Sequence, residues 1–421
     1  MTTVLKTLQE RGLFEDSTSP ELDSALRQPI TMYAGFDPSY HSLQAGNFVT
    51  IMALSHFQRA GHKVLALVGG ATGLIGDPSG KTTERQMQTT EQIEFNLEGI
   101  KENLSRFIEF DKGSNPATMV NNYDWHKQFS FISYLRDVGC HFRMGSMLAK
   151  ESVRARLNSE VGMSFTEFCY QTLQGYDFLH LYDNHDCRLQ IGGSDQWGNI
   201  TAGTELIRRC RGAEAFGMTF PLVTDSQGRK FGKSEGNAIY LDHRLTSYYA
   251  FYQFFMRTED ADVCRYLRIF TFLPLEEIAA LEEAVRTEPE KRLAQRTLAE
   301  DLTLRVHGAT GLQAARRATE VLFGGSMEGL RADDLVPIFA DVPSSTLPRT
   351  EVAGQSVIDV AVASGLSKSK GEARRLADSG GLYVNNERVA VATTVSDDMI
   401  IDNRMLVLRA GRKNYHVVKI G

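Results

Sequence analysis

The first half of the chain alternates short apolar runs with segments whose apolar residues recur every three or four positions. The apolar runs fall at 31–36, 64–68, 117–120, 188–191 and 220–223. Such runs are typical of β-strands, and their alternation with amphipathic helices predicts a parallel sheet with helices on both faces. We therefore expect an α/β, Rossmann-like catalytic domain over residues 1–245.

One helix of this domain is expected to begin near Ala45. It follows the turn Asp37-Pro38-Ser39, so its free N–H groups can receive an anion. The residues on its apolar face are Val49, Met52, Ala53, His56, Phe57 and Ala60.

The pattern changes after residue 245 and again after residue 322. Residues 246–322 read as helices throughout, with an aromatic run at 248–255 that is more typical of a core than of a ligand site, and we expect a helical domain. Residues 323–353 are rich in glycine and proline and lose periodicity, which indicates a linker with some local structure. Residues 354–421 read as helices followed by strands, and predict a small α+β domain.

Composition places the chain among soluble globular proteins. Of its 421 residues, 42% are hydrophobic and 23% charged, enough for two or three domains. The longest nearly uncharged apolar stretch, 64–76, is too short to span a bilayer, and no secretory signal is visible. The five cysteines include no Cys-x-x-Cys pair, so we expect reduced thiols, a cytoplasmic protein and no structural metal site.

The charge is uneven along the chain. The net charge of −6 argues against a nucleic-acid partner, yet the part from Gly365 onward carries ten Lys and Arg against six Asp and Glu. That part is therefore +4 and the rest −10. A basic module on an acidic body indicates an RNA partner, whose phosphates the basic residues would meet.

Two segments carry most of the candidate chemistry, Leu189-Gln-Ile-Gly-Gly-Ser-Asp-Gln-Trp-Gly-Asn199 and Lys230-Phe-Gly-Lys-Ser234. The first brings bare backbone and a carboxylate to the carboxyl edge of the sheet, and the second brings two ammonium groups. Taken alone, the first could also be an ordinary turn and the second a solvated loop. Together they predict a nucleotide site with phosphate ligands on a loop.

Two other nucleotide-binding motifs are less well supported by the sequence. The segment Gly76-Asp-Pro-Ser-Gly-Lys-Thr82 is one residue short of a phosphate-binding loop, because the required first glycine would fall at Ile75. No Gly-x-Gly-x-x-Gly occurs, so dinucleotide binding has little support.

The chain resembles the bacterial-type tyrosyl-tRNA synthetases, a class I family, over nearly its whole length. Besides the two segments above, the resemblance rests on the sequences at 33–38, 66–79, 121–125 and 164–168. It implies activation of L-tyrosine by ATP to tyrosyl-adenylate, transfer to tRNA(Tyr), and a homodimer with no membrane association. Mg²⁺ would accompany ATP and pyrophosphate, with no dedicated carboxylate cage. The resemblance further implies that the helical domain, 246–322, is of the anticodon-binding type. The tail, 354–421, is similar to a small ribosomal-protein-type RNA-binding domain.

The resemblance also implies roles for individual residues. Those expected to bind tyrosine are Tyr33, Asp77, Tyr170, Gln174, Asp177 and Gln196, with Tyr33 and Asp177 at the phenol. Those expected to bind ATP are Asp37, Ser39, Gln44, Asn47, Gly193, Asp195 and Lys233. Those expected to stabilise the leaving phosphates are Lys230, Lys233, Gln44, Lys81 and Arg85, and those expected to bind RNA are Lys370, Arg374 and Arg375.

The main departure from the family pattern is Gln44-Ala-Gly-Asn47, where the family carries His-Ile-Gly-His or a close variant. The Asn47 amide can imitate an imidazole N–H donor, whereas Gln44 cannot become cationic. His41 is a possible substitute for the missing imidazole. The alternative function is accordingly a non-housekeeping synthetase-like protein with weakened activation that binds tyrosine or RNA. A third hypothesis is an RNA-binding protein that acts through its tail. It does not explain the pattern of glycines and carboxylates in the rest of the chain.

Overall fold

The protein was analysed as a computed structural model that describes residues 3–78, 88–158, 162–234, 237–340 and 342–421. The chain forms two compact units, each discontinuous in sequence. Unit 1 comprises residues 1–246 and 253–306, and unit 2 comprises residues 247–252 and 307–421. No helix in the described parts is long and apolar enough to cross a membrane.

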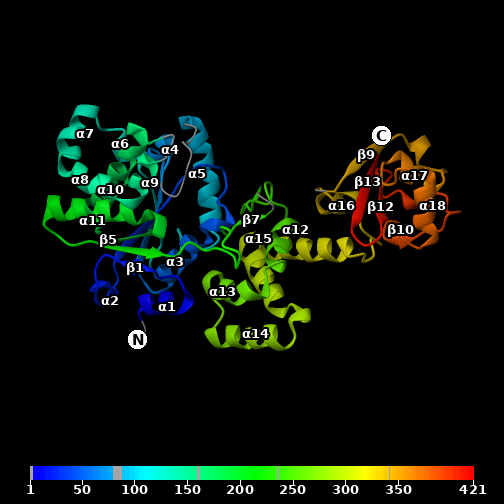
Figure 1. The fold of residues 1–421 in the computed structure, drawn as a ribbon, viewed down its shortest axis with the longest axis horizontal. Helices are drawn as coiled ribbons and strands as arrows, with labels where there is room; N and C mark the ends of the chain where they lie inside the picture. Colours follow the sequence, from blue (N-terminus) through cyan, green and yellow to red (C-terminus); the bar gives the residue numbers. More distant parts are fainter. Residues whose placement is uncertain (1–2, 79–87, 159–161, 235–236, 341) are drawn as a thin grey trace. The chain divides into compact units, whose positions relative to one another are not determined.

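Unit 1 is built on a six-stranded sheet with the order β1-β6-β5-β2-β3-β4 (Figure 1). Its strands are β1 Asp16–Ser17, β2 Thr31–Phe36, β3 Lys63–Val68, β4 Thr118–Asn121, β5 Cys187–Gly193 and β6 Phe216–Phe220. All neighbours are parallel except β1, which pairs antiparallel with β6. The expected parallel sheet is confirmed.

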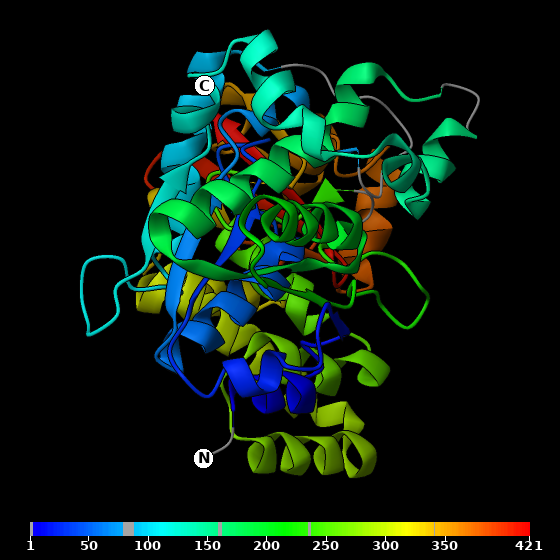
Figure 2. The ribbon, with the colours of Figure 1, turned by 90° about the vertical axis from the view of Figure 1, so that its left-hand side faces the viewer.

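Helices cover the sheet and extend unit 1 beyond it. Those before β6 are α1 Val4–Arg11, α2 Leu22–Ala25, α3 Phe48–Arg59, α4 Thr72–Ile75, α5 Thr90–Leu104, α6 Tyr123–His126, α7 Phe131–Asp137, α8 Met144–Leu148, α9 Glu151–Leu157, α10 Phe165–His185 and α11 Trp197–Arg211. The later ones are α13 Asp260–Phe270 and α14 Leu275–Thr287. Figure 2 looks onto the face of the sheet covered by α10 and α11. There Phe178 and Leu206 pack with Tyr33 and Leu65.

The last strand of the sheet differs from the expected 220–223. It runs from Phe216 to Phe220, because Pro221 has no N–H to donate to a further ladder position. Gly217 also fits only without a side chain, since a Cβ there would lie 2.3 Å from Ile200. A glycine in so short a run weakens the strand pattern in the sequence.

The all-helical region expected at 246–322 is divided between the two units. Its helices include α12 Tyr248–Met256 and α15 Leu293–Leu322. Gly308 interrupts α15 with a φ of 70° and a ψ of −176°, a conformation that only glycine adopts readily. The boundary between the units falls beside this break.

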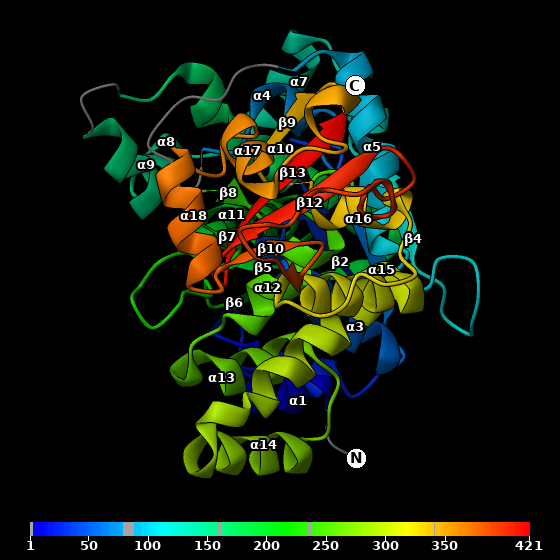
Figure 3. The ribbon, with the colours of Figure 1, turned by 90° about the vertical axis from the view of Figure 1, so that its right-hand side faces the viewer.

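Unit 2 contains a five-stranded sheet with the order β11-β10-β12-β13-β9 (Figure 3). The strands are β9 Ser344–Leu347, β10 Leu382–Val384, β11 Glu387–Arg388, β12 Met405–Ala410 and β13 Asn414–Ile420, and the helices are α16 Ala332–Ile338, α17 Val357–Ala363 and α18 Lys370–Asp378. Alternate residues of β12 enter two cores: Leu406 and Leu408 pack with α17 and α18, whereas Met405 and Val407 pack with α16 and the end of α15.

The segment expected to be a linker, 323–353, is part of this unit. It contains α16, and its strand β9 pairs parallel with β13 from Val417 to Ile420. The short strand Ser344–Leu347 lies between prolines, which conceals it in the sequence. The small domain therefore begins well before residue 354.

Candidate active site

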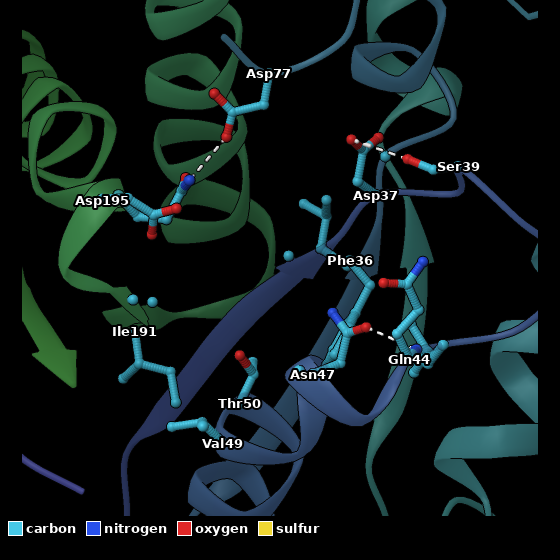
Figure 4. Close-up of a pocket in the computed structure, with 18 of the residues that line it drawn as sticks. Phe36, Asp37, Ser39, Gln44, Asn47, Val49, Thr50, Asp77, Ile191 and Asp195 are labelled. Carbon is cyan, nitrogen blue, oxygen red and sulfur yellow. Dashed lines mark hydrogen bonds between the residues drawn. The ribbon is translucent and has the colours of Figure 1, made fainter. Parts of the chain in front are cut away.

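A cavity of about 770 Å³ opens at the carboxyl edge of the sheet in unit 1. The ends of β2 and β5, the start of α3, α10 and the loop that carries Lys230 all contribute to its lining. Figure 4 shows Phe36 of β2, Ile191 of β5 and Val49 of α3 among the lining residues. This is the edge at which open parallel sheets bind ligands. The described residues expected at tyrosine and ATP line the cavity, apart from Lys233, whose side chain the structure does not describe.

One end of the cavity holds Tyr33 and Asp177, which come from β2 and α10. Both are buried, with exposures of 1%. The Tyr33 hydroxyl has no hydrogen-bond partner among the described residues, although a buried hydroxyl normally has one. Burial, followed by the charge of Asp177, raises the pKa of Tyr33 well above its usual value, so the hydroxyl keeps its proton. The Tyr33 hydroxyl can therefore donate a hydrogen bond to a bound ligand.

Asp177 is held by three donors from one short segment. Trp125 Nε1 and His126 Nε2 lie 2.8 Å from its Oδ1, and Asn122 Nδ2 lies 3.1 Å from its Oδ2. Asn122 is fixed in turn, because its Oδ1 accepts the N–H of Ala71 at 2.7 Å. A carboxylate has about four lone-pair sites, so Asp177 can accept one further hydrogen bond.

The sequence did not identify these supporting residues. The string Asn121–Trp125 contributes to the family resemblance, but nothing in it indicates which side chains reach a carboxylate on a later helix. The one feature that could have identified them is their position. Asn122, Trp125 and His126 lie in the short turn and helix that follow β4, at the carboxyl edge of the sheet.

The middle of the cavity contains a chain of amides that ends on a carboxylate. Gln174 Nε2 lies 3.3 Å from Gln196 Oε1, and Gln196 Nε2 donates to Asp77 Oδ2 at 2.7 Å. Tyr170 is buried beside them, and burial, followed by the charges of Asp77 and Asp37, raises its pKa. These groups can surround an ammonium and a carboxylate that share one carbon.

The segment 37–47 forms a further part of the lining. Gln44 N donates to Asn47 Oδ1 at 2.9 Å, shown dashed in Figure 4. Because the backbone N–H needs an acceptor, the Asn47 oxygen is occupied, and its Nδ2 is left as a donor. Ser39 contacts Asp37, with its Oγ 3.5 Å from Oδ2.

His41 does not replace the missing imidazole. Its ring stacks on Phe95 with centroids 4.1 Å apart, and its Nδ1 lies 2.8 Å from the Phe95 carbonyl oxygen. It is absent from the cavity lining, whereas its neighbours Tyr40 and Ser42 belong to it.

Close backbone contacts explain two glycines of the site. A Cβ on Gly193 would lie 2.7 Å from Asp195 Oδ1, so bare backbone is required beside this carboxylate. Gly232 has a φ of +92°, and a Cβ there would lie 2.7 Å from Gly46 N. The lysine loop and the segment that carries Gln44 and Asn47 therefore touch through glycines.

Phe231 anchors the lysine loop. It is buried at 7% exposure and stacks on Phe270 with centroids 4.6 Å apart. The loop thereby places Lys230 in the lining of the cavity. The side chain of Lys233, together with Lys81 and Arg85, lies outside the described residues.

The described lining of the cavity is acidic. It contains the carboxylates of Asp37, Asp77, Asp177 and Asp195, and Lys230 is its ammonium group. No group of three or more His, Cys, Asp or Glu among the described residues could hold a metal ion. The site suits a substrate with an ammonium group, and a polyphosphate requires further cations.

The residues expected to bind RNA lie together on α18 in unit 2. Lys370, Arg374 and Arg375 are exposed, while Ala373 and Ala377 bury the opposite face of the helix. Lys370 also forms an exposed ion pair with Asp359 at 2.7 Å, which leaves it accessible.

Comparisons with known proteins agree with this arrangement. Residues 25–324 match the family of tRNA synthetases class I (W and Y), and residues 334–418 match the tyrosine–tRNA ligase SYY-like C-terminal domain. The tyrosine–tRNA ligase of Roseiflexus castenholzii is 48% identical over 100% of both chains, and that of Geobacillus stearothermophilus is 49% identical over 99% of both. The crystal structure of a C-terminally truncated Aspergillus nidulans mitochondrial tyrosyl-tRNA synthetase is similar with a TM-score of 0.69 and 31% identity, over 77% of this chain and 95% of that one. The chain therefore belongs to the family of tyrosine–tRNA ligases, the tyrosyl-tRNA synthetases of class I.

Proposed function

We propose that the cavity of unit 1 joins L-tyrosine to ATP, and that the protein then transfers the tyrosyl group to tRNA(Tyr). The observation that carries this proposal is the pair of buried groups at one end, the unpartnered Tyr33 hydroxyl and the Asp177 carboxylate. A phenolic hydroxyl would donate to Asp177 and accept from Tyr33. Phenylalanine would leave both groups unpaired, a penalty that tyrosyl enzymes as a class exploit at roughly 10⁵-fold.

The remaining groups place the rest of the substrate. The α-ammonium fits among Asp77, Tyr170 and Gln174, with Gln196 beside the carboxylate. The adenosine and ribose are assigned to Asp37, Gly193 and Asp195, and the phosphates to Ser39, Gln44 and Asn47. Each assignment follows the family resemblance, and all of these groups line the same cavity.

The reaction itself needs no general base. A substrate carboxylate is already ionised at neutral pH, so it can attack the α-phosphate directly once it is aligned. The barrier is lowered by donors and cations that meet the charge growing on the pyrophosphate. We assign Lys230 to this role, which its position in the cavity lining supports, and we assign Lys233, Lys81 and Arg85 to it through the family resemblance.

The acidic lining explains why ATP would arrive with Mg²⁺. The described carboxylates offer no cage of their own for a metal, and Mg²⁺ is usually held by phosphate oxygens, water and one or two carboxylates. The ion would neutralise part of the charge of the triphosphate, and the residues named above would orient the ATP that it accompanies.

Pyrophosphate exchange tests the activation step. Tyrosine should stimulate exchange of labelled pyrophosphate into ATP, and phenylalanine should do so at least about 10⁴-fold less efficiently. Equal stimulation by both would contradict the assignment of Tyr33 and Asp177. Exchange near background with tyrosine, despite tight tyrosine binding, would favour the synthetase-like alternative with weakened activation. Cytoplasmic action is consistent with all five cysteines being free thiols.

We further propose that the protein is a homodimer. Large apolar side chains are exposed on α7, α8 and the first residue of α10, namely Phe131, Ile132, Leu135, Met144, Leu148 and Phe165. Soluble monomers rarely expose large apolar patches, and we infer that these side chains contact a second copy. Phe131→Asp with Ile132→Asp should convert the dimer to monomer in sedimentation velocity, and an unchanged sedimentation coefficient would place any interface elsewhere.

A further inference from the structure

Lys230 lies near the end of a hairpin formed by residues 223–231. Thr224 and Lys230 are paired in an antiparallel bridge, and Phe231 N donates to Val223 O at 3.0 Å. Val223, Lys230 and Phe231 line the cavity. The position of Lys230 in the cavity therefore depends on what holds the rest of this hairpin.

The hairpin rests on the first turns of α13. Asp262 on this helix is buried, at 4% exposure. Its Oδ2 accepts the backbone N–H of Ser226, in the turn of the hairpin, at 2.8 Å. Its Oδ1 accepts from Arg265 Nη2 at 3.1 Å, and the same nitrogen also donates to the carbonyl oxygen of Thr224. Asp262 and Arg265 thus form one bridge from α13 to the turn and to a strand of the hairpin.

Further contacts from α13 and the residue before it surround this bridge. Tyr266 Oη donates to the Thr224 carbonyl oxygen at 3.2 Å, and Glu259 accepts from Ser226 Oγ at 2.9 Å. Thr224 is the bridge partner of Lys230. The contacts with α13 therefore act on the residue directly opposite the one that carries the ammonium group.

Asp262 needs both of its donors because it is buried. A buried carboxylate is tolerated when hydrogen-bond donors surround it, so loss of either partner disturbs the whole contact. The Arg265 side chain is 44% exposed, and it reaches from the surface of α13 onto the hairpin. A displacement of about 1 Å at a catalytic group can slow a reaction by about 10²-fold, so even a small movement of Lys230 should be measurable.

We propose that Asp262 and Arg265 are positioning residues for adenylate formation: together they hold the hairpin 223–231 against α13 and so fix Lys230 beside the leaving phosphates. This inference rests on the proposed function, which assigns Lys230 to those phosphates. It gives α13 a part in catalysis, although none of the described lining residues of the cavity belongs to that helix.

The first test is Arg265→Leu, which keeps an apolar side chain at a partly exposed position and removes the guanidinium. Stopped-flow measurement at saturating substrates should show adenylate formation slowed by about tenfold, because Lys230 is displaced. The Kd for tyrosine should stay within about twofold, a split that general damage to the fold would not produce. Arg268→Leu is the matched control on the same helix, since Arg268 pairs with Glu282 at 2.6 Å, and it should change neither quantity.

Asp262→Asn is the second variant. The amide oxygen can accept from Ser226 N or from Arg265, and the amide N–H groups then face the other donor. Asp262→Asn should also slow adenylate formation, and the double variant with Arg265→Leu should be slowed by less than the product of the two single effects, because the two residues form one bridge.

Limited digestion with trypsin tests the contact with α13 without any chemistry. Arg229 and Lys230 are exposed residues of the hairpin. Cleavage after them, identified by mass spectrometry, should be faster in Arg265→Leu than in the unaltered protein and unchanged in Arg268→Leu. An unchanged rate of adenylate formation in Arg265→Leu, an equal loss in Arg268→Leu, or unchanged cleavage would each overturn the inference. Absence of tyrosine-dependent exchange in the unaltered protein would instead overturn the proposed function, while the digestion would still show whether Arg265 holds the hairpin.

Discussion

At the scale of single residues, the strength of the site lies in how Asp177 is held. Trp125, His126 and Asn122 all donate to it, so its position does not depend on the substrate. An asparagine at this position would direct its side-chain N–H groups at side chains that are themselves donors. The conflict would be buried, where unsatisfied polar groups are costly.

Asp177→Asn should therefore lower kcat/KM for tyrosine activation by about 10²-fold or more, because a charge-assisted hydrogen bond to the phenol is lost and buried donors are left unpaired. The ratio of tyrosine to phenylalanine activity should fall with it. Asp183→Asn is a matched control on the same helix, since Asp183 pairs with Arg211 at the surface. Unchanged discrimination in Asp177→Asn would mean that the phenol binds elsewhere.

The residues of the site were predictable to different degrees. Tyr33 and the glycines at 192–193 were expected because they belong to strings that match a known family, and Asp177 was expected from the same resemblance; all of them line one cavity. The partners of Asp177 and the neighbours of Gln44 were not expected. Contacts such as that between Gln44 and Tyr240 join segments almost two hundred positions apart, and a single sequence carries no record of such pairing.

At the scale of elements, the two signature loops depend on a close approach that only glycine allows. Gly232→Ala would place a Cβ against Gly46 N and should push Lys230 and its loop away from the phosphates. We expect adenylate formation to slow by about tenfold or more, because small displacements of catalytic groups are costly, while tyrosine affinity stays unchanged. Gly228→Ala is the matched control, since Gly228 has a similar φ of +79° but nothing within 4 Å of its Cβ. If both variants slowed adenylate formation equally, the cause would be backbone strain at the positive φ and not the contact with Gly46.

The helix α3 contains a titratable group that should make stability depend on pH. Burial, followed by the charges of Arg11 and Arg59, lowers the pKa of His56 to about 3. The unfolded chain would bind this proton near pH 6.5, so the folded state loses stability as the pH falls from about 6.5 toward 3. The slope should be up to about 1.4 kcal/mol per pH unit for this one group.

His56→Gln should remove that contribution. In urea unfolding at pH 7.5 and pH 5, the difference between the two midpoints should be smaller for the variant than for the unaltered protein. The exposed His243, changed to Gln, serves as the control. An unchanged difference for His56→Gln would show that the imidazole is protonated in the folded state at pH 5.

Elements were predictable where burial is regular and less so where it is not. Strands β2 and β3 are long, apolar and bounded by turns, and β2 and the expected run at 31–36 coincide. The short strand β9 could not be seen, because four residues rich in serine and threonine carry no apolar signal. What makes them a strand is the edge of β13, a partner some seventy positions away.

At the scale of the whole molecule, the basic excess of the tail makes sense as a separate RNA-binding unit. The exposed face of α18 carries Lys370, Arg374 and Arg375, and none of them lines the cavity of unit 1. We expect charging of tRNA(Tyr), but not pyrophosphate exchange, to weaken as salt rises, because phosphate contacts release counterions.

Removal of this unit should separate the two half-reactions, provided that the cut respects the fold. A chain ending at residue 324 keeps all of unit 1, and it ends where the match to the class I tRNA synthetase family ends. It should retain pyrophosphate exchange within about twofold while tRNA charging falls by about tenfold or more, because only phosphate contacts made by the tail are lost. A chain ending at residue 353 keeps β9 and α16 but removes β12 and β13, against which they pack. It should aggregate in sedimentation velocity, since an unpaired strand and an uncovered apolar core are exposed. If the shorter chain loses exchange while remaining folded by circular dichroism, unit 2 has a part in activation that its charge does not reveal.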